Sequence, residues 1–170
     1  MDFIELAKKR YSCKKYSTRP VEQEKLDRIL EAGRLAPTAK NLQEQHIYIA
    51  QTDDVLSRVD RHTPCRYGAP VVLIIAYEKE NVYTYPDGVL TSGMEDGAIV
   101  ATHMMLAAAA EGVDSCWINR FDPDGIAAEF NIPDSEQAFM LLDLGYAAEG
   151  AGPLANHTSR KPLTDTVTLL

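Results

Sequence analysis

The sequence predicts an α+β or α/β sandwich built on one sheet. Two observations lead to this fold class. Short aliphatic segments typical of strands alternate with segments whose apolar residues recur at helical spacing, and two expected helices precede them. A length of 170 residues, of which 45% are apolar, suits one domain with a sizeable core. We therefore expect residues 1–170 to form a single domain that ends in a tail over 149–170.

Two helices are expected before the first strand. Asp2 is a good N-cap for a helix that runs to about Lys9. Pro20 is expected to begin the second helix, which ends near Pro37. The apolar residues expected on the buried faces are Phe3, Ile4, Leu6 and Ala7 in the first helix, and Leu26, Ile29, Leu30 and Gly33 in the second. A polar loop over 36–43 follows.

The strands are expected at 46–50, 70–77, 113–118 and 138–146. The segment 70–77 is apolar on both faces, so we place it at the centre of the sheet. Two shorter helices are expected, one capped by Asp53 and one running from Asp122 to Phe130. Residues 78–92 are polar and read as a loop that covers part of the fold.

Residues 95–111 give the strongest helix signal. Apolar residues occur nearly all round this helix, which is typical of a helix buried inside a larger body. A monomer of this size offers little material to cover it, so a partner subunit is the expected cover. Gly112 ends the helix.

Composition and charge exclude several classes of function. The formal net charge of −8 argues against nucleic acid as the main partner. No apolar run reaches the roughly 20 residues that a membrane span needs, and the first residues lack the layout of a secretory signal. We therefore expect a cytoplasmic protein that does not bind membranes.

No metal site or disulfide framework is expected. The three cysteines are Cys13, Cys65 and Cys116, which are far apart and form no CxxC pair. The four histidines are scattered without ligand spacing. The sequence also lacks a GxGxxG or Walker segment, so it signals no Rossmann or P-loop nucleotide site.

A basic motif follows the first helix at residues 9–16. Arg10, Ser12 and Lys14 supply a guanidinium, a hydroxyl and an ammonium group, which together suit a dianionic phosphate. A solvated helix end is the alternative reading. The segment resembles the R-[RH]-S-x-[RK]-x-[FY] signature of the nitroreductase family of FMN-dependent flavoproteins. The resemblance implies that Arg10, Tyr11, Ser12 and Lys14 bind FMN, with Lys14 near N1 and O2 of the flavin ring.

The polar loop over 36–43, Ala-Pro-Thr-Ala-Lys-Asn-Leu-Gln, is similar to the A-P-S-[SAG]-x-N-x-Q loop of the same family. In that family one subunit supplies the loop and it lies on the flavin held by the other. The residues thereby implied in cofactor binding are Pro37, Thr38, Ala39, Asn41 and Gln43. The family usually continues with Pro-Trp, whereas this chain has Glu44 and Gln45. An ordinary turn that ends a helix is the alternative.

A third motif covers the long helix and the strand after it. Residues 112–118 resemble the family's G-[LI]-[GD]-[SA]-x-[WP]-I strand. The resemblance implies that Trp117, Ile118 and Asn119 lie beside the cofactor, and that the backbone N–H of Asn119 donates to flavin N5. Arg120 stands where relatives often have glycine. A helix–strand unit of the core is the alternative.

The fourth motif, at 159–163, is similar to the family's C-terminal R-K-P-L element. It implies Arg160, with Lys161 in reserve, as a second clamp on the phosphate; a solvated charge pair is the alternative. Residues 166–170 are strand-like. In relatives such a tail crosses to the partner and extends its sheet, so 149–170 is expected to embrace a second subunit.

The resemblance implies one mixed, mainly antiparallel sheet in a homodimer, completed by the partner's C-terminal strand. The implied function is ping-pong hydride transfer from NADH or NADPH, through N5 of FMN, to a nitroaromatic, quinone or similar acceptor. It assigns no catalytic acid or base. The alternatives are a flavin-binding redox sensor or carrier without significant turnover, and another reaction on the same scaffold. The sequence distinguishes neither NADH from NADPH nor one acceptor from another.

Overall fold

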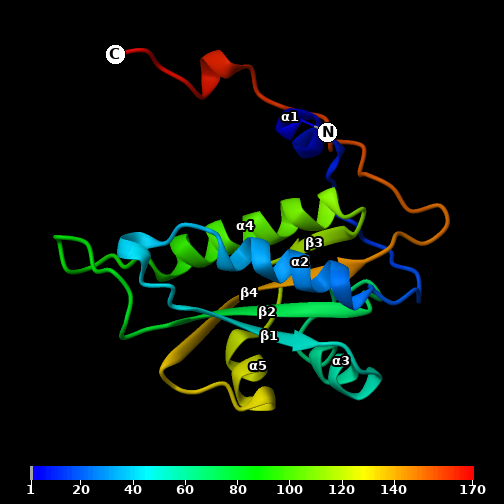
Figure 1. Cartoon of the computed structure of the whole chain (residues 1–170), viewed down its shortest axis with the longest axis horizontal. Coiled ribbons are helices and arrows are strands. Elements are labelled where there is room, and N and C mark those ends of the chain that lie inside the picture. Colours follow the sequence, from blue (N-terminus) through cyan, green and yellow to red (C-terminus); the bar gives the residue numbers. More distant parts are fainter. Residues whose placement is uncertain (1) are drawn as a thin grey trace.

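A four-stranded sheet forms the centre of the computed structural model, which describes residues 2–170 (Figure 1). The strands are β1 (Gln45–Ala50), β2 (Val71–Glu78), β3 (Asp114–Ile118) and β4 (Glu136–Gly145). Their order is β1-β2-β4-β3, and all three pairings are antiparallel. The one parallel element described is an isolated bridge between Ser12 and Ser115. The four-stranded sheet is therefore antiparallel throughout, with this parallel bridge beside its β3 edge, and the expected α+β fold class is confirmed.

Helices cover both faces of the sheet. The helices on one face are α2 (Gln23–Arg34) and α4 (Gly93–Ala110), and those on the other are α3 (Asp53–Val59) and α5 (Pro123–Phe130). Residues along β2 alternate between the two faces. Leu73 and Ile75 enter the core under α2 and α4, whereas Val72 and Ile74 enter the core under α3 and α5. The strand is thus buried on both sides, as its sequence predicts.

Small residues let α4 approach its neighbours closely. A Cβ atom at Gly97 would lie 2.5 Å from the ring of Phe139 on β4. A Cβ atom at Gly33 of α2 would lie 2.8 Å from the side chain of Met104. The face of α4 that carries Ala98, Ile99 and Thr102 borders an open surface groove, and Met94 at the start of the helix is 59% exposed. The single chain therefore covers only part of this helix.

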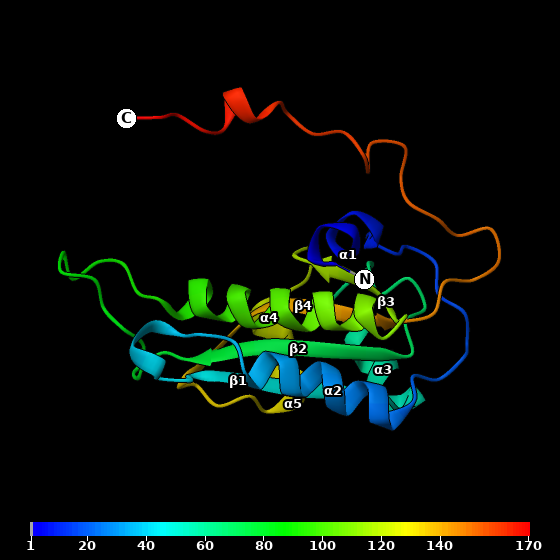
Figure 2. The ribbon, with the colours of Figure 1, turned by 45° about the horizontal axis from the view of Figure 1, so that its top comes forward.

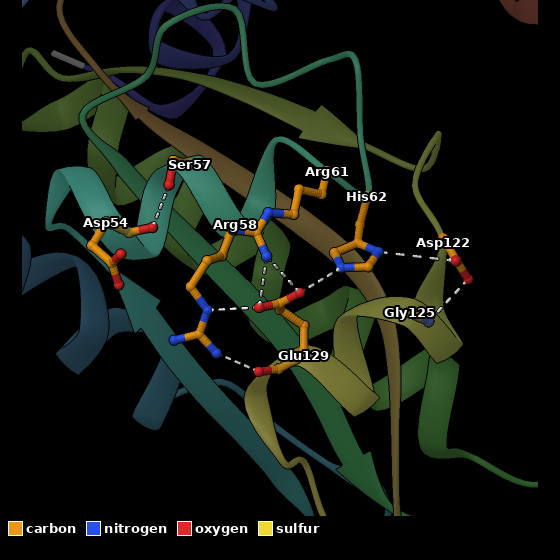
Figure 3. Close-up of polar contacts among 8 residues, drawn as sticks. All are labelled: Asp54, Ser57, Arg58, Arg61, His62, Asp122, Gly125 and Glu129. Atoms are coloured by element: carbon orange, nitrogen blue, oxygen red, sulfur yellow. Dashed lines mark hydrogen bonds and ion pairs between the residues drawn. The ribbon is translucent and has the colours of Figure 1, made fainter.

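A polar network joins α3 to α5 on the opposite face (Figure 3). Glu129 accepts from Arg58 Nε at 2.7 Å, and its carboxylate lies 3.3 Å from Nε2 of His62. His62 also accepts, through its backbone carbonyl, from the N–H of Asp122. Asp122 caps α5 by accepting from the N–H of Gly125 at 3.0 Å. The network fixes both ends of α5 against the segment that follows α3.

Two expectations for the N-terminal helices are wrong. The first helix, α1 (Phe3–Lys9), has the predicted Asp2 cap but no buried residue; Phe3 and Ile4 are 63% and 58% exposed. Leu6 and Ala7 are half-buried, and α1 contacts α4, so the single chain covers only part of the apolar face of α1. The second helix begins at Gln23 rather than Pro20, because the backbone stays extended long enough to bury Val21 in the core.

The tail leaves the sheet after β4 and runs back over α1 (Figure 2). It holds one 3-10 turn, η2 (Leu163–Asp165), and the expected strand at 166–170 does not form in the single chain. These last residues are exposed and pair with neither edge of the sheet. None of the helices within 2–170 combines the length and hydrophobicity that crossing a bilayer requires.

Candidate functional site

The basic motif is held against the edge strand β3. The backbone N–H of Cys13 donates to the carbonyl of Ser115 at 2.9 Å, next to the Ser12–Ser115 bridge. The Cys13 side chain is fully buried and anchors this segment. A surface hollow beside the motif is lined by Lys9, Arg10, Tyr11, Gly112 and Ser115, among others. Ser12 and Lys14 follow on the same segment, with Lys14 exposed.

The charges around this hollow favour an anion. Arg10 is half-buried, and its guanidinium forms no ion pair with any carboxylate in 2–170. Asp114, the one acid on the lining, is already engaged, because its Oδ2 accepts from the N–H of Ala147 at 2.9 Å. Burial and the nearby Asp114 raise the pKa of Tyr11 to about 12, so Tyr11 stays a neutral donor. A phosphate group fits this donor set.

The C-terminal motif reaches the same end of the molecule. His157 Nε2 lies 3.3 Å from the carbonyl oxygen of Lys8, and its ring stands edge-on to that of Tyr11 at 6.3 Å. Arg160 donates to the carbonyl of His157 at 2.6 Å and is otherwise exposed, as is Lys161. The structure thus brings both predicted phosphate-binding motifs into one region, with Arg160 turned onto its own backbone.

The 36–43 loop lies at the other end of α4. The N–H of Ala39 donates to Oδ1 of Asp96 at 2.9 Å, and the N–H of Gln43 donates to the hydroxyl of Thr38 at 3.0 Å. The loop contains the 3-10 turn η1 (Ala39–Asn41), and its residues with positive φ are Lys40, Asn41 and Gln43. Such a run of non-glycine residues in the left-handed region is costly and is typical of functional loops. Pro37, Asn41 and Gln43 are exposed.

The end of β3 carries the third predicted group. Trp117 is half-buried against the core under α4, and its Nε1 donates to Oδ1 of Asn119 at 2.7 Å. Ile118 points into the opposite core and is buried. The carbonyl of Arg120 accepts from the hydroxyl of Thr63 at 2.7 Å, which fixes the turn after the strand and leaves the Arg120 side chain exposed.

One chain does not bring all of these residues together. The Arg10 hollow adjoins Ala109 at the C-terminal end of α4, whereas the 36–43 loop is held by Asp96 near its N-terminal end. The helical rise puts those two positions about 20 Å apart. Figure 1 shows the same arrangement, with η1 near the start of α4 and α1 nearer its end.

Sequence reasoning missed three buried acids. Glu44, Asp96 and Asp143 are 5%, 3% and 1% exposed, and each has a carboxylate oxygen without a hydrogen-bond partner among the described residues. The sequence does mark Glu44 as unusual, because it stands where the family that the chain resembles has proline. It also marks Asp143, which interrupts an otherwise apolar strand. Neither signal names the group that each acid faces.

Comparison with known proteins gives a consistent result. The model of the "Nitroreductase family" matches residues 7–65 and 63–146 of this chain. The crystal structure of a nitroreductase family protein from Clostridium difficile 630 is 36% identical, with a TM-score of 0.92 over 99% of this chain and 98% of that one. An FMN-dependent nitroreductase from Clostridium difficile R20291 is 26% identical, with a TM-score of 0.73 over 94% and 98%. A Thermus thermophilus NADH dehydrogenase is 26% identical over 186 residues, which cover 90% of each chain.

Proposed function

Because the chain belongs to the nitroreductase family and is an NAD(P)H-dependent oxidoreductase, we propose that it carries FMN and passes hydride from NADH or NADPH to a small-molecule acceptor. When bound, FMN supplies the redox chemistry, a ping-pong hydride transfer through N5 to a nitroaromatic, quinone or similar compound. The FMN-dependent relative supports this choice of cofactor. The reaction takes place in the cytoplasm, where reduced nicotinamide cofactors are found.

The observation that carries the proposal is the unpaired guanidinium of Arg10 beside a hollow. Arg10, Tyr11 and Ser12 would hold the FMN phosphate there, and Arg160 or Lys161 would turn from solvent to complete the clamp. Gly112 lines the same hollow with a φ of 70° and no Cβ atom, so nothing there obstructs a bulky anion. Lys14, which is exposed at the end of this segment, would lie near the pyrimidine edge of the ring.

The remaining flavin contacts come from a second copy of the chain in this proposal. Thr38, Asn41 and Gln43 lie too far from Arg10 to touch the same FMN within one chain. Pairing two copies with their α4 helices opposed would place each 36–43 loop at the partner's hollow and cover the open face of α4. The exposed tail over 149–170 then embraces the partner, and the apolar face of α1 gains a cover.

The end of β3 would position the flavin ring. The Trp117–Asn119 hydrogen bond and the Thr63–Arg120 contact hold the turn rigid on both sides. A rigid turn keeps the backbone N–H of Asn119 directed at a fixed point, which is what a donor to N5 requires. We assign no side chain as catalytic acid or base.

Replacing Arg10 by alanine tests the proposal. The change removes a charge-assisted hydrogen bond to phosphate, so FMN affinity should fall about ten- to a hundredfold. Flavin fluorescence titration measures the dissociation constant. Lys15 is an unsuitable control, because its Nζ donates to the carbonyl of Glu149 and ties down the tail. Arg61→Ala, on the far face of the sheet, is the matched control.

An unchanged dissociation constant for Arg10→Ala would contradict the phosphate assignment. Purified protein that contains FAD, or that takes up no flavin on reconstitution, would contradict the cofactor. Protein that binds FMN but oxidises neither NADH nor NADPH would point instead to a redox sensor or carrier.

A further inference from the structure

Glu44 and Asp96 form a buried pair of carboxyl groups beneath the 36–43 loop. Glu44 is the residue before β1, and Asp96 lies in the first turn of α4. Oδ1 of Asp96 accepts from the N–H of Ala39, but its Oδ2 and both carboxyl oxygens of Glu44 have no partner among the described residues. The side chains of the two acids contact each other. Asp96 therefore links the loop to Glu44.

Two ionised carboxylates cannot share this space without a large electrostatic cost. Burial, followed by the contact with Asp96, raises the pKa of Glu44 from 4.5 to about 7, while the Ser92 hydroxyl acts in the opposite direction. A neutral Glu44 gains an O–H donor, and Oδ2 of Asp96 is an acceptor without a donor. A proton on Glu44 thus satisfies both groups.

The other charged groups at this edge do not supply a counter-charge. A hollow beside Glu44 is lined by Gln43, Gln45, His46, Glu78, Glu80, Asn81 and Glu136. His46 Nδ1 is already 2.8 Å from Oε1 of Glu136. Glu78 and Glu80 are acidic, and Lys40 lies over the ring of Tyr83. With no counter-charge nearby, a proton on Glu44 relieves the repulsion between the two carboxylates.

We propose that Glu44 is a positioning residue for the 36–43 loop: its neutral carboxyl group donates to Asp96 and holds Asp96 in place to accept from the N–H of Ala39. Loss of that proton loosens the loop. The role of the loop in binding flavin rests on the proposed function, whereas the anchoring of the loop does not. Proline, which the family usually has at this position, carries no carboxyl group and so could not anchor the loop in this way.

The sign of the pH effect follows from the direction of the pKa shift. A group whose pKa is higher in the anchored state stabilises that state fully below its ordinary pKa of 4.5. The stabilisation declines as the pH rises from there to about 7, and it stays constant above. The equilibrium constant for opening the loop should therefore rise by up to roughly tenfold per pH unit between pH 5 and 7.

Hydrogen exchange at the Ala39 amide tests the anchor. After correction for intrinsic exchange, the opening constant in the wild-type protein should rise from pH 5 to 7, while the core amide of Leu141 reports any global change. Glu44→Gln keeps a donor to Asp96 and has no proton to lose, so its opening constant should not depend on pH. Glu80→Gln, an exposed acid at the same edge, should behave like wild type.

If the opening constant at Ala39 changes with pH equally in the wild type and in Glu44→Gln, the proposal is overturned. If the variant does not fold, a carbon NMR titration of the Glu44 carboxyl in the wild-type protein decides: a midpoint well above its ordinary value supports the pair, and an ordinary midpoint overturns it. FMN affinity should follow the Ala39 profile. If the loop opens as the pH rises while FMN affinity stays constant, the anchoring role of Glu44 stands. The assignment of the loop to flavin binding is then overturned.

Discussion

Asp143 is a second buried acid, toward the C-terminal end of β4, where it pairs with Cys116 of β3. Both of its carboxyl oxygens lack a hydrogen-bond partner among the described residues. Burial raises its pKa well above the usual range, and the positive charge of Arg66 only partly opposes this. Burial therefore favours the neutral form of the group, and ionising it would leave a poorly compensated charge in the core.

Replacing Asp143 by asparagine should change how stability depends on pH. Because the pKa is raised in the folded state, wild-type stability falls as the pH rises from the ordinary pKa toward the folded one. Asparagine has the same shape and no proton to lose, so the variant should become the more stable protein by about 1–3 kcal/mol at pH 9. Urea unfolding at pH 5, 7 and 9 measures the difference. If the free energy of unfolding changes equally with pH in both proteins, this account is contradicted.

The residues around α5 show how one side chain can join two elements. Glu129 accepts from Arg58 and faces His62 and Arg61, so it links α5 to α3 and to the turn after it (Figure 3). The hydrogen bonds with Arg58 and His62 hold the pKa of Glu129 below its usual range, so the carboxylate stays charged near neutral pH.

Replacing Glu129 by alanine should lower the melting temperature by a few degrees, since it leaves Arg58 and His62 without their acceptor. Arg61→Ala is the matched control, because its contacts with Glu129 are 3.5 Å long, and it should change the melting temperature much less. Calorimetry measures both variants. Equal effects would mean that the carboxylate acts through general surface charge rather than through the link to Arg58.

The elements themselves were largely predictable. Periodicity located every strand to within a few residues, and the caps at Asp2 and Asp122 are where the side-chain chemistry predicts them. The expected cap at Asp53 is wrong, because Thr52 caps α3 by accepting from the N–H of Val55. The start of α2 was not predictable, because it depends on Val21 reaching a core built from distant segments. The contact of Glu44 with Asp96, and of Glu129 with Arg58, joins residues 52 or more positions apart. Local patterns carry no information about such contacts. The assignment of individual residues to FMN stays a prediction.

The exposed C-terminal tail leads to a prediction about the assembly of the whole molecule. Leu163, Val167 and Leu169 are 77%, 56% and 94% exposed, so they add little to the stability of a single chain. Deleting 163–170 should leave the fold intact while weakening the dimer and FMN binding together. Sedimentation velocity at micromolar concentration, with flavin absorbance recorded alongside, measures both. An intact protein that sediments as a monomer with FMN bound would contradict the shared site.

The proposed sharing of each site between the Arg10 hollow of one subunit and the 36–43 loop of the other has a genetic consequence. At FMN concentrations too low to fill the weakened sites, a subunit with Arg10→Ala and a subunit with a disabled 36–43 loop would each be inactive alone. In a mixed dimer, however, one of the two sites would receive both intact halves, and the other site would receive both defects. When equal amounts of the two subunits pair at random, half of the dimers are mixed and each mixed dimer has one intact site. About a quarter of the native sites should therefore be restored. In the proposed dimer, two alleles defective in different halves of the site would complement each other in one cell.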